Sequence, residues 1–219
     1  MTKLQFKTLK EVHEFYARNN RCGLRKTATQ PVYELNIPKS GIVFVGEAPG
    51  ANEDREGKPF VGAAGKLLDE LLSKIKMKRG DVYVTNVVKY RPPQNREPLP
   101  EEKVACRTWL NAELMLIKPK VIIPLGKHAL ERFVPGLKIS SAHGQAYEHP
   151  SGIPIFAMYH PAVALYNPTL KKDLERDFIR LKSLLEGKLP LQEVEGIKRP
   201  TKSKLTTKQT DIIDDILTL

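Results

Sequence analysis

The chain has little cysteine and no long apolar run, and each shortage excludes a class of protein. Cys22 and Cys106 are the only cysteines among 219 residues. Two are too few for a disulfide scaffold, so we expect a reducing, cytoplasmic setting. No apolar run approaches the ~20 residues that a bilayer span needs. The N-terminal residues alternate charged and apolar side chains at helical spacing, which argues against a signal peptide.

Acidic residues are also scarce relative to basic ones. Lysine and arginine together number 36, against 25 aspartates and glutamates, which gives a formal net charge of +11. Such an excess favours a polyanionic partner. Nucleic acid is the leading expectation, with an acidic membrane surface or a purely solubilising charge as alternatives. No membrane contact is expected, and a monomer is predicted.

What the sequence does contain is an alternation of strand and helix. Apolar runs rich in valine and isoleucine predict four strands, at 42–45, 81–88, 120–126 and 153–160. Apolar residues at helical spacing predict helices at 7–19, 63–77, 100–117, 127–134 and 169–187. This alternation predicts an α/β fold, a three-layer α/β/α sandwich with a mostly parallel four-stranded central sheet.

Composition divides the chain into three parts. We expect residues 1–187 to form the α/β domain, residues 188–208 a flexible basic linker, and residues 209–219 a short amphipathic helix. Lys198 to Lys208 carry five positive charges and no acid, so this segment is either a solvated linker or a contact to DNA phosphates. The terminal helix either docks on the domain or binds a repair or replication protein.

Polar residues follow three of the predicted strands. The segment "GEAPGANEDREGKPFVGAAG" at 46–65 follows the first strand, a loop from Asn86 to Asn95 the second, and His160 ends the fourth. Because the carboxyl ends of parallel strands meet at one edge of a sheet, these residues are expected to converge. A carboxylate such as Glu47 would repel a bound phosphate, so the first loop suits a neutral ligand.

Three blocks, "GEAPGANEDREGKPFVGAAGKLLDELL", "NVVKYRPPQNREPLPEE" and "YHPAVAL", resemble in order and spacing the signatures of family 4 uracil-DNA glycosylases. The resemblance spans about residues 15 to 186. It implies a monofunctional enzyme of base excision repair, which flips uracil out of DNA and hydrolyses its N-glycosidic bond to leave an abasic site.

Four residues suit that reaction chemically, and the resemblance places the same four in the site. His160 can donate a hydrogen bond to the uracil O2 as negative charge develops there. Glu47 can orient or deprotonate the attacking water. The Asn86 amide matches O4 and N3–H of uracil, and Phe60 offers a flat face for the extruded base. Each residue alone has a structural alternative. Glu47 could be a helix-terminal charge, Asn86 a turn residue, Phe60 a core side chain and His160 a cap.

The resemblance adds further positions. Asn95 would be catalytic, Gly46 would line the uracil site, and Glu53 would lie near the uracil C5 edge. Three residues would contact DNA: Leu165, Ala164 and Lys89. Leu165 would wedge into the gap left by the flipped base, with core packing as its alternative. The remaining histidines are interpreted as surface or structural residues: His13, His128, His143 and His149.

The family typically holds a [4Fe–4S] cluster on four cysteines. At the corresponding positions this sequence has Asn19, Cys22, Tyr90 and Cys106. Asparagine and tyrosine do not replace cluster thiolates, so we expect no cluster and no metal. The two cysteines are expected near each other, as a reduced pair or a disulfide.

Other functions fit the sequence less well. A DNA-binding scaffold that has lost catalysis is the main alternative, and it is disfavoured because Glu47, Asn86 and His160 are all present. A nucleotide hydrolase would need a Walker-type lysine motif or an acidic metal cluster. No lysine stands among the strand-end residues to act as a lyase. The loop "YRPPQNREPLP" has no histidine, so covalent capture of DNA is not expected.

Overall fold

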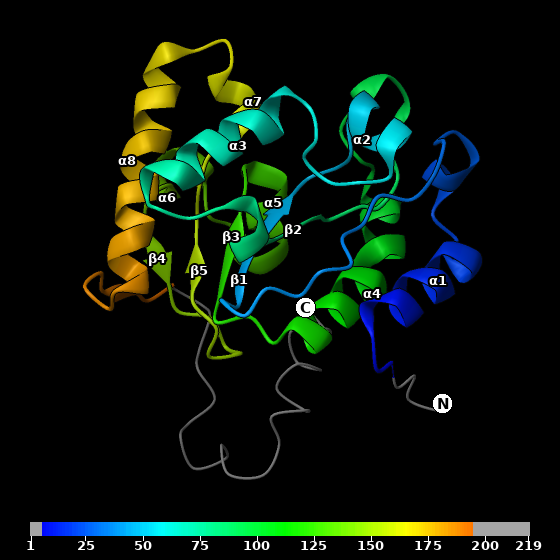
Figure 1. Cartoon of the computed structure of the whole chain (residues 1–219), viewed down its shortest axis with the longest axis horizontal. Coiled ribbons are helices and arrows are strands. Elements are labelled where there is room, and N and C mark those ends of the chain that lie inside the picture. Colours follow the sequence, from blue (N-terminus) through cyan, green and yellow to red (C-terminus); the bar gives the residue numbers. More distant parts are fainter. Residues whose placement is uncertain (1–5, 195–219) are drawn as a thin grey trace.

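The computed structural model describes residues 6–194, in which helices cover both faces of a central sheet (Figure 1). The helix expected at 209–219 and most of the expected basic linker, from residue 195 onward, lie outside the described residues. Among residues 6–194, no helix is both long enough and apolar enough to cross a membrane.

The sheet has six strands in the order β2-β1-β3-β5-β4-β6. Their bounds are β1 Ile42–Gly46, β2 Tyr83–Asn86, β3 Val121–Pro124, β4 Ala146–Tyr147, β5 Ile155–Phe156 and β6 Leu191–Gln192. All pairings are parallel except that of β4 with β5. The prediction of a mostly parallel sheet is confirmed, whereas the count of four strands is wrong. β4 and β6 have two residues each, too few to show a period, and β6 lies beyond residue 187.

The five helices predicted within the described residues are all present there, together with three shorter ones. The α-helices are α1 Leu9–Asn19, α2 Ala51–Glu56, α3 Ala63–Lys74, α4 Pro100–Ile117, α5 Lys127–Phe133, α6 Ile139–Ala142, α7 Pro161–Ala164 and α8 Pro168–Leu185. Three 3₁₀ turns lie at Gly23–Lys26, Arg79–Asp81 and Pro93–Asn95. The Thr8 and Asn167 side chains cap α1 and α8, each accepting from backbone N–H groups of the first turn.

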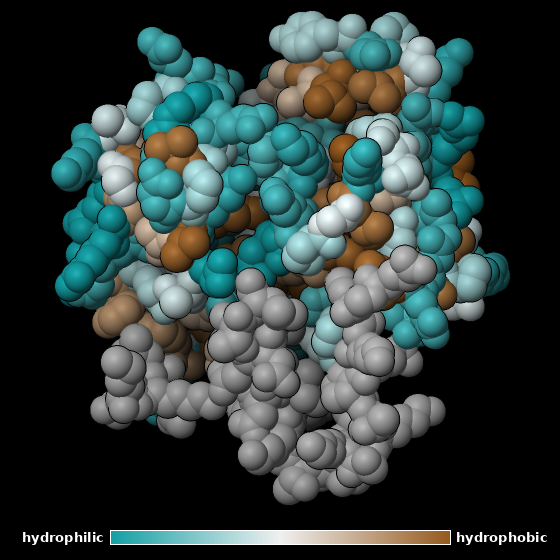
Figure 2. Space-filling view, turned by 180° about the vertical axis from the view of Figure 1, so that it is seen from behind, coloured by the Kyte–Doolittle hydropathy of each residue, from teal (hydrophilic) through white to brown (hydrophobic). Residues whose placement is uncertain are grey.

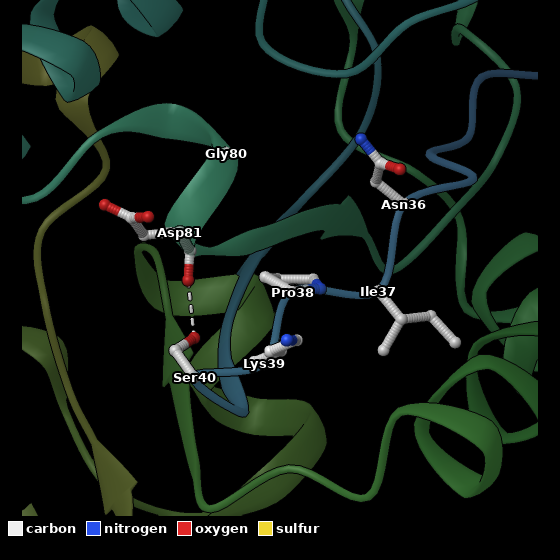
Figure 3. Close-up of a pocket in the computed structure, with 7 residues that line it drawn as sticks. All are labelled: Asn36, Ile37, Pro38, Lys39, Ser40, Gly80 and Asp81. Atoms are coloured by element: carbon white, nitrogen blue, oxygen red, sulfur yellow. Dashed lines mark hydrogen bonds between the residues drawn. The ribbon is translucent and has the colours of Figure 1, made fainter.

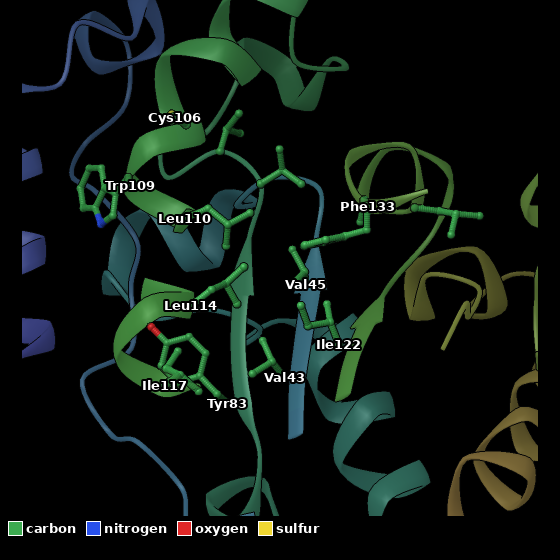
Figure 4. Packing of buried hydrophobic residues seen from close by; sticks show 14 of the residues in the cluster. Val43, Val45, Tyr83, Cys106, Trp109, Leu110, Leu114, Ile117, Ile122 and Phe133 are labelled. Atoms are coloured by element: carbon green, nitrogen blue, oxygen red, sulfur yellow. The ribbon is translucent and has the colours of Figure 1, made fainter. Parts of the chain in front are cut away.

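Successive residues of β1 point to opposite faces of the sheet and so supply two separate cores. Val43 and Val45 pack with α1, α4 and α5. In Figure 4 the apolar side chains of α4 lie against this face. Ile42 and Phe44 pack with α3 and α8 on the other face. With both faces covered, only the ends of the strands are left for a site.

A charged pair lies inside the first core. The Lys89 ammonium is 2.7 Å from a carboxylate oxygen of Glu113, and both side chains are fully buried. Lys89 Nζ also donates to the Thr85 hydroxyl and to the Asn86 carbonyl oxygen. The prediction that Lys89 contacts DNA is therefore wrong, because its ammonium group is fully buried and paired with Glu113. Its contact to Asn86 makes it part of the support beneath the strand end.

Candidate active site

The carboxyl ends of four neighbouring segments form one edge of the sheet. Gly46 at the end of β1 pairs in register with Asn86 at the end of β2. Beyond β3, Leu125 bridges to Met158, and the Gly126 N–H donates to the Met158 carbonyl at 2.8 Å. The sheet order thus lines up the residues at the carboxyl end of each strand. Along this edge they are Asn86, Glu47, His128 and His160.

Asn86 carries a buried polar atom without a partner. The residue is only 2% exposed, and its Oδ1 has no hydrogen-bond partner among the described residues. A Cβ on Gly46 would lie 2.4 Å from this oxygen and 2.7 Å from the Phe60 ring. Only glycine at position 46 lets both the amide and the ring approach the backbone there so closely. An orphan acceptor of this kind is typical of a ligand site.

The loop before α3 holds Phe60 in an unusual conformation. Phe60 has φ +55°, a left-handed value that is uncommon for a bulky non-glycine residue. The Arg79 guanidinium donates to its carbonyl at 2.5 Å, and Gly65 has no Cβ to collide with that carbonyl. Phe60 is thereby fixed beside Gly46, with its ring centroid 5.4 Å from that of His160.

Glu53 binds the backbone of the same loop. Its Oε1 accepts from the N–H groups of Val61 and Gly62 at 2.9 and 2.8 Å, and its Oε2 accepts from Gly50 N–H at 3.1 Å. Glu53 was expected near the uracil C5 edge. In the structure both its oxygens are engaged by the backbone, so the residue shapes the loop that presents Phe60.

His160 is the N-cap of α7, and that contact fixes its tautomer. Its Nδ1 accepts from the Ala162 N–H at 3.1 Å, so in the neutral ring the proton lies on Nε2. Burial lowers the pKa of His160 to about 4, against a smaller opposing effect of Glu53. The imidazole is therefore neutral at physiological pH and presents Nε2–H as a donor.

Glu47 is a half-buried carboxylate beside a histidine. Burial raises its pKa, while the nearby His128 acts in the opposite direction. His128 Nε2 lies 3.9 Å from Glu47 Oε2. No described residue donates a hydrogen bond within 3.5 Å to the Glu47 carboxylate, which leaves it free to accept from a water molecule or a ligand.

Asn95 does not join these residues in the structure. It lies on the exposed turn Pro93–Asn95, where its Oδ1 accepts from Arg91 Nε at 2.8 Å. Like Phe60, it has a left-handed backbone, with φ +56°. Neither Glu47 nor His160 makes a described hydrogen bond to Asn95.

Comparison with known proteins assigns the chain to a family. Residues 33–181 match the family model of the uracil DNA glycosylase superfamily. The chain belongs to that superfamily. It is 45% identical to a type-4 uracil-DNA glycosylase of Archaeoglobus fulgidus over 179 residues, 78% of this chain and 89% of the relative. It is 41% identical to a type-4 enzyme of Sulfurisphaera tokodaii, over 81% and 84% of the two chains.

More distant superfamily members also align. A type-5 uracil-DNA glycosylase of Thermus thermophilus is 38% identical over 151 residues, 60% of this chain and 68% of the relative. The type-4 relatives match over more of the chain and at higher identity, so the resemblance to family 4 is confirmed.

Residues 163–166, which follow His160 in the chain, form a mostly exposed and largely apolar tip. Leu165 is 37% exposed, Val163 45% and Tyr166 91%. In Figure 2 apolar side chains lie exposed at the upper edge, over α7 and the start of α8. Ala164 is only 3% exposed and packs in the second core, so the expectation that its side chain contacts DNA is wrong. Tyr166 was missed, although it directly follows the predicted wedge.

The region of the family's cluster holds two thiols and a phenol. Cys22 and Cys106 are buried and free, and the Cys22 thiol donates to the Glu102 carbonyl oxygen at 3.8 Å. Tyr90 is 2% exposed, packs edge-on against Trp109 at 6.0 Å, and has a buried hydroxyl without a described partner. Asn19 instead donates its amide to the Phe15 carbonyl. This donor set does not fit a [4Fe–4S] cluster, which needs four ligands of thiolate or imidazole type.

A shallow surface pocket lies at the other edge of the sheet. Its lining comes from the segments that precede β1 and β2, as Figure 3 shows: Asn36, Ile37, Pro38, Lys39, Ser40, Gly80 and Asp81. The Ser40 hydroxyl donates to the Asp81 carbonyl across it. None of the candidate catalytic residues contributes, because those follow the strands, whereas the pocket precedes them.

Proposed function

We propose that this protein is a monofunctional uracil-DNA glycosylase, which extrudes uracil from DNA and hydrolyses the N-glycosidic bond to leave an abasic site. One observation carries the proposal: the orphan Oδ1 of Asn86 lies against Gly46 and Phe60, on the edge that also bears Glu47 and His160. Membership of the superfamily makes DNA the partner.

The extruded base would stack on Phe60 and bind Asn86. The amide of Asn86 accepts from uracil N3–H through Oδ1 and donates to O4 through Nδ2. Cytosine presents a lone pair at N3 and an amino group at C4, the reverse pattern. Discrimination of this kind leaves a buried polar group unpaired in the wrong complex, so it is strong.

Bond cleavage would divide charge between base and sugar. As the C1′–N1 bond breaks, its electron pair passes to the uracil ring, and the His160 Nε2–H donates to O2, where negative charge develops. The carboxylate of Glu47 faces the cationic sugar and accepts the proton of the water whose oxygen bonds to C1′. The products are free uracil and an abasic deoxyribose.

We further propose that the reaction proceeds without an iron–sulfur cluster, whose structural place Tyr90 and its neighbours take. Protein purified with no bound iron is expected to unfold cooperatively and to release uracil at the same rate before and after chelator treatment. Iron content, thermal unfolding and activity are measured on one preparation. Recovery of activity only after reconstitution with iron and sulfide would contradict this.

Leu165 and Tyr166 would enter the DNA stack as the base leaves. Each alanine substitution is expected to slow uracil release from duplex DNA by roughly tenfold, because the gap in the stack is then unfilled. Release from single-stranded DNA should change much less, since no gap forms. Ile179→Ala, which truncates an apolar residue 62% exposed on α8, is the matched control. Equal effects on both substrates would argue against a wedge.

The function itself is tested by alkali-dependent cutting of an oligonucleotide with a single uracil, beside Glu47→Gln protein. Cutting by the wild type that the variant loses supports the glycosylase. DNA binding without cutting would instead support the inactive scaffold. A monomeric state, a cytoplasmic location and a repair or replication partner for the C-terminal helix remain predictions.

A further inference from the structure

His128 lies between two carboxylates and an ammonium group. It stands in the first turn of α5, and its side chain is 9% exposed. Its Nε2 is 3.0 Å from Oε1 of Glu97 and 3.9 Å from Oε2 of Glu47. Its Nδ1 is 3.2 Å from Nζ of Lys103. Three separate segments, the loop after β1, the loop before α4 and α4 itself, thus converge on one imidazole.

The neighbours of the ring determine where its proton lies. A lysine ammonium has three donors and no acceptor, so Nδ1 of His128 accepts from Lys103. The proton of the neutral ring is then on Nε2, which faces both carboxylates. Nε2–H can donate to either of them, and the structure has it at hydrogen-bond distance from Glu97. The chain of hydrogen bonds therefore runs from Lys103 through His128 to Glu97, and the Glu47 carboxylate lies 3.9 Å from the same Nε2.

We propose that His128 is a positioning residue for Glu47, whose carboxylate it holds ionised and oriented toward the sugar, with Glu97 anchoring the imidazole and Lys103 polarising it. The inference rests on the proposed function. His128 does not itself touch the reacting atoms. It acts on a carboxylate that accepts no hydrogen bond within 3.5 Å from any described residue, His128 included, so its effect on Glu47 is electrostatic across 3.9 Å.

The charges around Glu47 determine the direction in which each neighbour shifts its pKa. Burial raises the pKa of Glu47; His128, Lys103 and Lys127 act to lower it, and Glu97 to raise it. Glu47 is active as a base when ionised, so activity falls on the acid side of its pKa. His160 keeps its Nε2–H in either protonation state, because a second proton adds at Nδ1. The acid limb of the rate profile therefore follows Glu47.

Substitutions of His128 and of Glu97 should move the acid limb of the rate profile in opposite directions. His128→Leu removes the donor and is expected to shift the limb to higher pH by at least half a unit, about threefold in rate on the limb. His128→Gln can both accept from Lys103 and donate to a carboxylate, so it should restore much of the wild-type profile. Glu97→Gln removes a like charge and should shift the limb to lower pH.

The measurement is the single-turnover rate of uracil release against pH, with enzyme in saturating excess over uracil-containing DNA. Glu186→Gln is the matched control, since that glutamate pairs with Lys188 at the end of α8 and lies outside the site. If the wild type releases no uracil, the proposed function fails. If it is active but His128→Leu and Glu97→Gln both retain its profile, or shift in the same direction, only the role of His128 is overturned. Because Glu97 is 69% exposed, Glu97→Gln keeps the test valid even if His128→Leu fails to fold.

Discussion

His160→Ala is expected to slow the single-turnover release of uracil by about 10²–10³-fold, the usual effect of losing one preorganised donor to a developing anion. The reason is geometric. Nδ1 of His160 is occupied by the Ala162 N–H, so Nε2–H is its only free donor. Uracil-DNA binding should change far less, because the donor matters most as the C1′–N1 bond breaks.

His160→Asn separates catalysis from the capping of α7. Asparagine is a favoured N-cap and can accept from the Ala162 N–H, but its short amide does not reach the position of Nε2. We therefore expect His160→Asn to lose as much activity as His160→Ala while it keeps the wild-type melting temperature. A rate within tenfold of wild type for both variants would exclude His160 as the main anion donor.

Lys89→Met is expected to lower the free energy of unfolding by about 3–5 kcal/mol, because it leaves the Glu113 carboxylate buried without its counter-charge. Burial raises the pKa of Glu113 and lowers that of Lys89, and in both cases it outweighs the attraction between them. The interior thus accommodates the two charges together at a cost, and one charge alone at a larger cost.

The double variant Lys89→Met/Glu113→Leu should recover most of that loss, since an apolar pair of similar volume removes both desolvation terms. Urea unfolding at pH 7 of the wild type, the two single variants and the double variant gives the coupling directly. Additive losses in the double variant would show that the two charges do not interact. The rate of uracil release is a second readout, because Lys89 also binds the Asn86 carbonyl.

Sequence patterns revealed those site residues that directly follow a recognisable strand. Glu47, Asn86 and His160 each come after a run of apolar residues, so their convergence followed from the parallel sheet alone. The same reasoning failed for Lys89, which also follows β2. Lysine is rarely buried, and its partner Glu113 lies 24 residues away on α4, a pairing that leaves no local signal.

The proposed role of His128 was missed in the sequence for a related reason. In the sequence it is one histidine in a short helix, whereas its partners come from two distant loops and a different helix. β4 and β6 were missed because a two-residue strand is stabilised by its neighbour in the sheet and not by its own pattern. In each case the information lay in tertiary contacts, which one sequence without relatives does not reveal.

The short helix α7 connects the residue proposed to donate to the base with the residue proposed to enter the DNA stack. The imidazole proposed to donate to the base also caps the helix whose far end carries Leu165. Four helical residues form a stiff lever, about 6 Å long at the usual helical rise. The residue proposed to enter the duplex is therefore held about one helical turn from the capping imidazole. In the proposed reaction, donation to the base and entry of Leu165 into the duplex would thus both depend on the integrity of one four-residue helix.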